Sequence, residues 1–534
     1  MPAEHQADYI VVGAGSAGSV VAARLSEDGR RQVLLLEAGG SDRRLTILMP
    51  AATMLLAITN PRYDWRFMAE PDPTRDGRED YMPRGKVLGG TSSINATSFI
   101  RGAPEDYNGW AALGCRGWDF ETVLPYFRRL EDYEGGANEY RGAGGPLSVS
   151  HIRSVHPLSR ALIESCVKAG MTFREDINLP PQMGVGYMQA SQRKGWRHSA
   201  SRAYLWPAKG RANLRIVTHA QALGLTFEGT RATGVEYLRR GRRRRATAAK
   251  AVVLCAGSFG SPQLLMLSGV GPAAHLREHG IEVRHDLPGV GENMQDHAGI
   301  SQTMWVNQTT YNVQTGPLSA LVYGAQWLLT GTGPASTPIA QVCGYRRCDP
   351  SKSRSHVQYL FSPAGYDLTA DGPEVFEKPA ITGLTNLHRP YSAGTVRLAS
   401  ADPLKQPAIQ PNLFADERDI ETLILGSRFF RTVLESEPIA RYIVAEHLPG
   451  RDVQSDDEWA DYIRANAIGV YHPAGTCKMG HDPMAVVDDG LKVHGMEGLY
   501  VADASIMPTV VSANLNATCI MIGERAGEMI RAAT

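Results

Sequence analysis

The sequence predicts a protein of two parts, an α/β domain of the Rossmann type that binds a dinucleotide and an α+β domain built on an antiparallel sheet. The first part is predicted by a glycine-rich turn between a strand and a helix near the N-terminus. Two further apolar strands, at residues 250–255 and 499–502, can extend the same sheet. The second part is predicted by segments between residues 356 and 399, which alternate apolar with polar side chains as half-buried antiparallel strands do.

The N-terminal βαβ unit consists of three consecutive segments. Residues 8–12 form an apolar run rich in β-branched side chains, residues 17–26 have helical character, and residues 32–37 form a second strand. The turn before the helix has the pattern G-x-G-x-x-G, GAGSAG at residues 13–18. Glycine lets the backbone of such a turn approach a pyrophosphate at the N-terminus of the helix.

Glu37 strengthens this interpretation, because it ends the second strand about twenty residues after the turn. There a carboxylate can accept hydrogen bonds from both ribose hydroxyls of an adenosine, and it would repel a phosphorylated ribose. A glycine turn needed only for packing is the weaker explanation. These residues alone leave NAD and FAD both open.

The second part contains predicted strands at residues 356–361, 381–388 and 395–399, and predicted helices at residues 319–329 and 416–435. The helix at residues 416–435 begins at an aspartate whose carboxylate can accept backbone N–H groups. An arginine cluster around Gly241, flanked by strand-like segments, predicts a solvated hairpin.

Composition narrows the class of partner. The 534 residues carry 55 basic and 55 acidic side chains, so no overall field attracts nucleic acid or an anionic membrane, and a small molecule is expected. Apolar stretches fall short of the roughly 20 residues that span a bilayer. The polar start of the chain does not resemble a secretory signal, so we expect a cytoplasmic protein, with peripheral membrane association left open.

Cysteines and histidines do not suggest a cross-linked or metal-binding protein. The seven cysteines are scattered without a C-x-x-C pair, so reduced thiols are expected. Histidines and cysteines do not cluster at ligand spacings, and no metal is expected. His275 and His279, four residues apart, are expected on an exposed helix.

Four long segments resemble the signatures of one enzyme family. GKVLGGTSSIN at residues 85–95 resembles the first signature of the glucose-methanol-choline (GMC) oxidoreductases, and GSFGSPQLLMLSGVG at residues 257–271 resembles the second. YHPAGTCKMG at residues 471–480 and VADASIMPTVVSANLNATCIMIGERAGEMI at residues 501–530 follow in that family's order and spacing. The resemblance covers essentially the whole chain and looks closest to the bacterial choline, L-sorbose, polyethylene glycol and related alcohol dehydrogenases.

The resemblance implies that the dinucleotide is FAD and that the protein oxidises the CH–OH group of a primary alcohol to the aldehyde, with hydride transfer to flavin N5. Electrons are expected to pass to O2 or to a quinone-type or dye acceptor, and Val470, two residues before the expected base, tilts this choice slightly towards O2. The domains should be interleaved. Residues 1–155, 210–306 and 467–534 are expected to bind FAD, and residues 156–209 and 307–466 to bind substrate.

The resemblance also assigns residues to the cofactor. Residues 89–95 should follow the flavin side of FAD, and Asp503 should lie near its pyrophosphate and ribityl chain. Some family members attach flavin to a histidine at the place that Ile94 holds here, so FAD is expected to be non-covalent. The full set expected to contact FAD is Gly13, Gly15, Ser16, Ala17, Gly18, Glu37, Ala38, Arg84, Val87, Gly89, Gly90, Thr91, Ser92, Asn95, Ala96, Ala256, Gly257, Asp503, Ala504 and Asn514.

His472 is the expected catalytic base, because removal of the hydroxyl proton assists hydride transfer and a neutral imidazole suits that task near pH 7. One histidine among 15 carries little weight, and its place in residues 471–480 supplies the argument. Asn516 is expected to donate a hydrogen bond to the substrate oxygen, with Asn514 as the rival because a shift of two residues exchanges them. The last helix should begin near Asn516, where its partial positive charge can stabilise the reduced flavin.

Three other functions remain as alternatives: a flavin-binding lyase of the same fold, an NAD-dependent dehydrogenase, and a non-enzymatic binding protein. The alcohol is open among polyol, choline-like, aliphatic and aryl compounds, and a homodimer is compatible with the sequence. Trp305, Tyr311, Trp327 and Phe361 are guessed as walls of the substrate pocket.

A choline-like substrate would need a carboxylate beside aromatic faces. Glu374 and Glu377 lie near Phe376 in the sequence, but their spacing does not join them into a cage.

Overall fold

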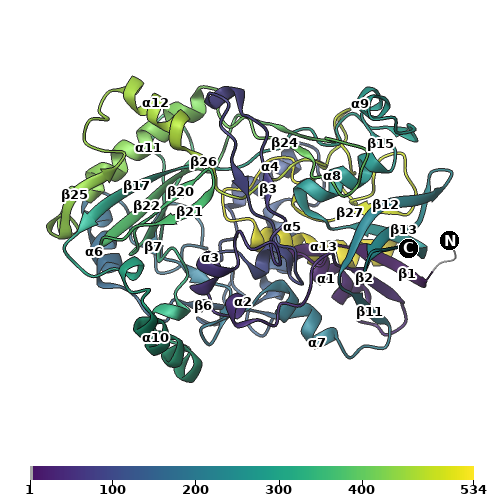
Figure 1. The fold of residues 1–534 in the computed structure, drawn as a ribbon, viewed down its shortest axis with the longest axis horizontal. Helices are drawn as coiled ribbons and strands as arrows, with labels where there is room; N and C mark the ends of the chain where they lie inside the picture. The colour runs from purple at the N-terminus through teal and green to yellow at the C-terminus, as the bar shows by residue number, and fades with distance from the viewer. Residues whose placement is uncertain (1–3) are drawn as a thin grey trace.

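Two seven-stranded sheets divide the structure, a computed structural model that describes residues 4–534 (Figure 1). The first sheet is mixed and has the order β11-β2-β1-β14-β13-β12, with β27 paired to β14. Its strands are β1 (His5–Val12), β2 (Val33–Leu36), β11 (Leu214–Val217), β12 (Ala220–Glu228), β13 (Arg231–Arg239), β14 (Arg242–Leu254) and β27 (Leu499–Val501). This sheet lies on the right in Figure 1.

The second sheet is antiparallel and has the order β25-β17-β22-β19-β18-β7, with β26 paired to β17. It lies on the left in Figure 1. Its strands are β7 (Gly184–Tyr187), β17 (Ala298–Val306), β18 (Val342–Arg346), β19 (Val357–Ser362), β22 (Ala380–Leu387), β25 (Ile443–Leu448) and β26 (Ile468–Gly469). The two sheets confirm the predicted fold class, an α/β nucleotide-binding part with an α+β part.

The parallel strands of the first sheet point their carboxyl ends at one edge. β1 pairs in parallel with β2 and β14, and β14 pairs in parallel with β27. β14 is 13 residues long, and its first half instead pairs antiparallel with β13. The turns after β1, β2, β14 and β27 therefore meet at this edge, which is where ligands bind in sheets of this type.

The predicted arginine hairpin is confirmed between β13 and β14. Arg239 pairs with Arg242, and the two turn residues, Arg240 and Gly241, have φ angles of 49° and 73°. Two consecutive positive φ angles are what a tight two-residue hairpin turn requires.

The first and last helices pack closely against each other. Helix α1 (Ser16–Leu25) follows the glycine turn, and α13 (Asn516–Ala533) begins where the sequence predicted. A Cβ on Gly523 would lie 2.7 Å from the Ala17 carbonyl oxygen. A larger residue there would push the two helices apart.

The second sheet is covered by helix α11 (Arg418–Leu434), which packs on β22. A Cβ on Gly383 would lie 1.9 Å from the Phe430 ring, so this contact needs glycine. Helix α10 (Pro317–Thr330) and α11 confirm the two predicted helices of this part. The helix begins at Arg418, two residues later than predicted, and the Asp416 side chain accepts the backbone N–H of Arg418 at 3.1 Å.

Two details of the prediction differ from the structure. Residues 395–399 were expected beside the other alternating strands, but β23 (Thr395–Arg397) pairs with β24 (Ala408–Gln410) in a small separate sheet. The domain boundary at residue 306 places β17 in the FAD-binding part, whereas β17 pairs with β22 in the antiparallel sheet. The remaining domain boundaries stay a prediction.

The structure of residues 4–534 bears on the expectations for membrane-spanning helices, metal sites and cysteines. Within this range no helix is both long and apolar enough to cross a membrane, and no group of three or more His, Cys, Asp or Glu side chains could hold a metal ion. The seven cysteines are free thiols. His275 and His279 are half-buried rather than exposed, because the His275 imidazole accepts the Leu398 N–H at 3.0 Å.

Candidate active site

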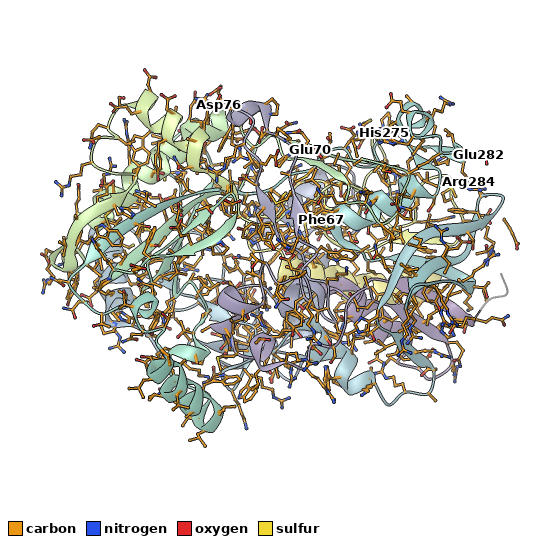
Figure 2. The ribbon with its side chains drawn as sticks, viewed as in Figure 1. Phe67, Glu70, Asp76, His275, Glu282 and Arg284 are labelled. Carbon is orange, nitrogen blue, oxygen red and sulfur yellow. The ribbon has the colours of Figure 1, made fainter. Side chains whose placement is uncertain are left out.

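A cavity of about 550 Å³ runs from the carboxyl edge of the parallel strands towards the second sheet. Phe67, one of its lining residues, lies in the middle of the molecule between the two sheets (Figure 2). The predicted site residues that line it are Gly13, Gly15, Ser16, Ala17, Glu37, Ala38, Arg84, Gly90, Thr91, Ser92, Asn95, Ala96, Ala256, Gly257, His472, Asp503, Ala504, Asn514 and Asn516. The structure therefore brings together segments from both ends of the chain.

Some glycines of the N-terminal turn allow close packing of the backbone, and another leaves space for a ligand. A Cβ on Gly13 would lie 2.4 Å from the Cys255 carbonyl oxygen, and one on Gly18 would lie 2.0 Å from the Gly13 carbonyl oxygen. These two glycines permit the close packing of β1, α1 and the end of β14, and Gly18 does not line the cavity. Gly15 is different, because the nearest atom to its Cβ position is 4.0 Å away. The open space beside Gly15 is available to a ligand.

The segment at residues 85–95 packs directly on this turn. The N–H of Gly89 donates to the Ala14 carbonyl at 2.7 Å, and a Cβ on Gly90 would lie 2.7 Å from the Gly15 Cα. Gly90 also has a φ of 52°, which favours glycine. Gly89 and Val87 do not line the cavity themselves. Val87 is buried in a small apolar cluster next to it.

Two carboxylates stand at the ends of the strands. The Glu37 carboxylate accepts the N–H of Ala14 at 2.9 Å and that of Gly39 at 2.7 Å, and burial raises its pKa to about 7. Each carboxylate oxygen retains a free lone pair for a ribose hydroxyl. The Asp503 carboxylate accepts the Gly257 N–H at 2.8 Å and thereby ties β27 to the start of the helix after β14.

His472 takes part in a chain of hydrogen bonds that fixes the position of its protons. His297 Nε2 lies 3.0 Å from the Val511 carbonyl oxygen, which can only accept, so this nitrogen carries a proton. Burial lowers the pKa of His297 to about 4, so the ring is neutral and its Nδ1 is an acceptor. That Nδ1 lies 3.0 Å from His472 Nδ1, which must therefore be the donor.

The remaining ring nitrogen of His472 is consequently unprotonated and can act as a base. Burial first, and then the nearby His297 and Arg84, hold the pKa of His472 well below its ordinary value of 6.5. Its Nε2 carries a lone pair and accepts the side-chain N–H of Asn514 at 3.1 Å. The backbone N–H of His472 donates to Asp296 at 2.7 Å, which holds the loop in place.

The two amides have different neighbours, and this bears on which of them would contact the substrate. The Asn516 side chain accepts a hydrogen bond from Ser16 Oγ at 2.9 Å, so it belongs to the glycine turn rather than to His472. Asn514, expected only as the rival, is the residue beside the imidazole. The shift of two residues arises because Asn514 precedes helix α13, whereas Asn516 is its first residue.

Arg84 is a half-buried cation in the wall of the cavity. Its guanidinium donates to the Tyr471 carbonyl at 2.9 Å and lies over the Phe259 ring at 5.1 Å. Burial lowers its pKa to about 10, while nearby Asp296 acts in the opposite direction. Within residues 4–534, Arg84 Nη2 and Asn514 Oδ1 are buried without a hydrogen-bond partner.

The residues of this cavity fit FAD. The space beside Gly15 can take the pyrophosphate, the Glu37 carboxylate can bind ribose, and the two polar atoms without a partner belong to Arg84 and Asn514, which line the cavity. Position 94 is occupied by isoleucine, whose side chain has no nucleophile that could form a bond to a flavin.

Two sequence models of protein families, both described as GMC oxidoreductase, match this chain at residues 7–299 and at residues 390–523. The chain belongs to the GMC oxidoreductase family. This family is FAD-dependent, which resolves the choice between NAD and FAD that the glycine turn left open.

Relatives of known name support the assignment. Human "Choline dehydrogenase, mitochondrial" is 43% identical over 533 residues, 98% of this chain and 89% of that one. "Oxygen-dependent choline dehydrogenase" of Rhizobium etli is 42% identical over 536 residues, 98% of this chain and 95% of that one. This GMC protein is accordingly an FAD-dependent alcohol oxidoreductase, and these relatives give no support to the lyase alternative.

Solved structures of the same fold include two oxidases. Pyridoxine 4-oxidase from "Mesorbium loti" superposes with a TM-score of 0.88 at 31% identity, covering 98% of each chain. Formate oxidase superposes with a TM-score of 0.93 at 27% identity, covering 100% of this chain and 99% of that one.

The guessed walls of the substrate pocket were wrong. Trp305, Tyr311, Trp327 and Phe361 lie outside the cavity lining. Trp327, for example, is fully buried against Trp196, with ring centroids 3.9 Å apart. The apolar side chains that line the cavity are instead Trp65, Phe67, Ile339, Leu360, Tyr366, Leu368, Leu384 and Val470.

The sequence did not predict His297 and Asp296, both of which form hydrogen bonds to His472. They follow no spacing rule relative to His472 and reach it through the pairing of β17 with β26, in which Ala298 lies opposite Gly469. Glu374 and Glu377 do not line the cavity either, and Phe376 packs against Trp305 instead.

The low pKa of His472 predicts an unusual pH profile. A base must be deprotonated to act, and the neutral form of His472 persists at pH values below the 6.5 of an ordinary histidine. We therefore expect kcat/KM for alcohol oxidation to stay on its plateau at pH 6.5 and to fall only at clearly lower pH. A limb with an apparent pKa of 6.5 or above in the pH profile would contradict this environment for the base.

Proposed function

We propose that the protein oxidises an uncharged primary alcohol to the aldehyde, with His472 as the base and Asn514 as the residue that orients the hydroxyl. The observation that carries the proposal is the hydrogen-bond chain from Val511 through His297, which leaves the lone pair of His472 Nε2 in the cavity. FAD, when bound, supplies the acceptor for the hydride that leaves the alcohol carbon.

The protein's own residues account for the proton. A bound alcohol would replace the Asn514 amide at His472 Nε2, so that Nε2 accepts the hydroxyl proton and Asn514 donates its N–H to the alcohol oxygen and stabilises the negative charge that develops there. His472 then carries two protons, and its Nδ1–H remains bonded to His297. One alcohol thus gives one aldehyde, a hydride for the cofactor and a proton for His472.

The charge of the cavity favours an uncharged substrate. Glu37 and Asp503 are the only carboxylates among the cavity-lining residues, and both already accept backbone N–H groups at the strand ends. Arg84, with a free Nη2, places positive charge in the same cavity as His472. Trp65, Phe67 and Tyr366 offer aromatic faces to a quaternary ammonium in this cavity, but the guanidinium of Arg84 would repel its positive charge.

Choline is the second candidate substrate, favoured by the two choline dehydrogenases at 42–43% identity. The deciding experiment compares choline with its uncharged carbon isostere, in which a tert-butyl group replaces the trimethylammonium group. Anaerobic flavin reduction is followed for both alcohols. Faster reduction by the isostere supports the proposal, and faster reduction by choline overturns it in favour of the second candidate.

The electron acceptor is proposed to be O2 or a quinone-type compound. Val470, a small apolar side chain, lines the cavity two residues before His472, and this favours O2 as the acceptor. Peroxide measured in air, beside turnover with a quinone or dye, distinguishes the two. A homodimer and cytoplasmic residence stay predictions.

His297 is expected to act as a positioning residue for the base. His297→Ala leaves His472 Nδ1–H without its acceptor, so the base can rotate or change tautomer, and kcat should fall roughly 10-fold to 100-fold. FAD content should not change, because His297 does not line the cavity. His297→Gln, whose side-chain oxygen can accept, should recover part of the loss.

FAD is expected to be released intact when the protein is denatured. Ile94 stands where a covalent attachment would be made, and its side chain cannot form one. Precipitation with acid should leave the flavin absorbance in the supernatant. Flavin that remains with the precipitate through washing in denaturant would show a covalent link elsewhere.

A further inference from the structure

Helix α10 exposes an unusual amount of apolar surface. Leu318, Leu321 and Leu329 are 75%, 69% and 85% exposed, and Val322 and Leu328 are each more than half exposed. Trp327 anchors the helix, because it is fully buried and its indole N–H donates to the Gly195 carbonyl at 2.8 Å. Exposed apolar patches of this kind mark interaction surfaces.

Apolar side chains continue from α10 onto two neighbouring helices, α2 (Leu45–Leu48) and α3 (Ala52–Leu56). Leu45 and Leu56 are 55% and 52% exposed. The Ala51 N–H donates to the Ala335 carbonyl, just after α10, which joins the two regions. Figure 1 shows α10 projecting from the lower side of the view, with α2 and α3 beside it. We call this the α10 face.

Charged residues on the α10 face are of one sign. Residues 43–63, 177–227 and 298–345 contain no aspartate or glutamate, and residues 298–345 contain no lysine or arginine either. Exposed basic side chains flank the leucines at Arg43, Arg44, Arg193 and Lys194. The last two lie in the hairpin around Gly195, whose backbone touches Gly331 at the end of α10.

We propose that the α10 face binds the surface of a bilayer that contains anionic phospholipids. Exposed leucines of α10 can enter the headgroup and acyl boundary, and the flanking basic side chains can pair with lipid phosphates. A second copy of the chain fits this face less well, because a two-fold contact would place the basic side chains against one another.

The α10 face also leads to the cavity. Ile58, just after α3, and Ile339, just after the segment that follows α10, both line it. A protein docked in this way would hold its cavity close to molecules that are dissolved in the bilayer. This gives the surface a use in the enzyme without adding a step to the reaction.

The test is flotation of the FAD-containing protein with vesicles of phosphatidylcholine alone or phosphatidylcholine mixed with phosphatidylglycerol. Binding is expected to the mixed vesicles and to weaken at high salt. Leu321→Glu should abolish flotation, whereas Leu113→Glu, at a similarly exposed leucine just after helix α4 (Pro104–Ala112), should not. The double variant Arg44→Glu/Arg193→Glu should weaken binding more than about 20-fold, since each basic residue contributes roughly fivefold.

FAD content and turnover with a soluble dye are measured for every variant and should not change, because none of these residues lines the cavity. Equal flotation of the Leu321 and Leu113 variants, or no flotation of the wild type with anionic vesicles, overturns the proposal. A dimer that Leu321→Glu dissolves, without any lipid binding, would identify α10 as a self-association surface instead.

Discussion

His472→Ala is expected to lower the rate of flavin reduction by an alcohol about 10²-fold to 10⁴-fold, the usual contribution of a general base. The imidazole is neutral, its Nδ1–H is held by His297, and its Nε2 faces the cavity. Alanine removes this lone pair and leaves a small cavity. Anaerobic rapid mixing with substrate isolates the chemical step from reoxidation.

The control for this variant is His481→Ala, at a partly exposed histidine that does not line the cavity. It should reduce flavin at the wild-type rate. FAD content of both variants should equal that of the wild type, because no hydrogen bond to the glycine turn is lost. An unchanged rate in His472→Ala would assign the base to another residue.

Gly15→Val is expected to give a folded protein that has lost FAD, with an affinity weakened by about 100-fold, which corresponds to about 3 kcal/mol. The backbone at Gly15 has a φ of −74°, which valine can adopt, and its Cβ position is free of protein atoms to 4.0 Å. The added Cβ would therefore meet no protein atom, and the side chain would occupy the space beside the helix N-terminus. Titration of the apoprotein with FAD measures the loss.

Gly210→Val is the matched control, because this exposed glycine has no atom within 4 Å of its Cβ position. It should bind FAD as the wild type does. Circular dichroism establishes whether Gly15→Val is folded. A folded Gly15→Val protein with wild-type FAD affinity would show that the pyrophosphate does not approach this glycine.

Local patterns predicted the N-terminal nucleotide-binding unit correctly. The strand, the turn and the helix around Gly13 lie within one continuous stretch, and steric rules decide which glycines are required. The alternating pattern also predicted the strands β19 and β22, but it did not predict their burial, because almost every residue of both strands is buried in the structure. Most boundaries differed from the prediction by one or two residues, but β1 begins three residues earlier than predicted and β14 eight residues earlier.

Contacts between distant segments could not be predicted in this way. His297 reaches His472 only because β17 pairs with β26, and no spacing in the sequence announces that pairing. The choice between Asn514 and Asn516 depends on where α13 begins to within two residues. Aromatic residues such as Trp327 were guessed as pocket walls from their size, but packing against Trp196 decided where that one lies.

β14 is paired to β1 through Leu254 and Val12, and to β27 through Leu254 and Val501. The ribosome synthesises these strands in the order β1, β14, β27. The sheet that contains β1 is therefore complete only after most of the chain has been synthesised. Helix α13, which covers α1, comes last of all. The yellow colour of bound flavin should therefore appear only on chains whose synthesis has reached the final helix, and it can serve as a marker of completed folding in the cell.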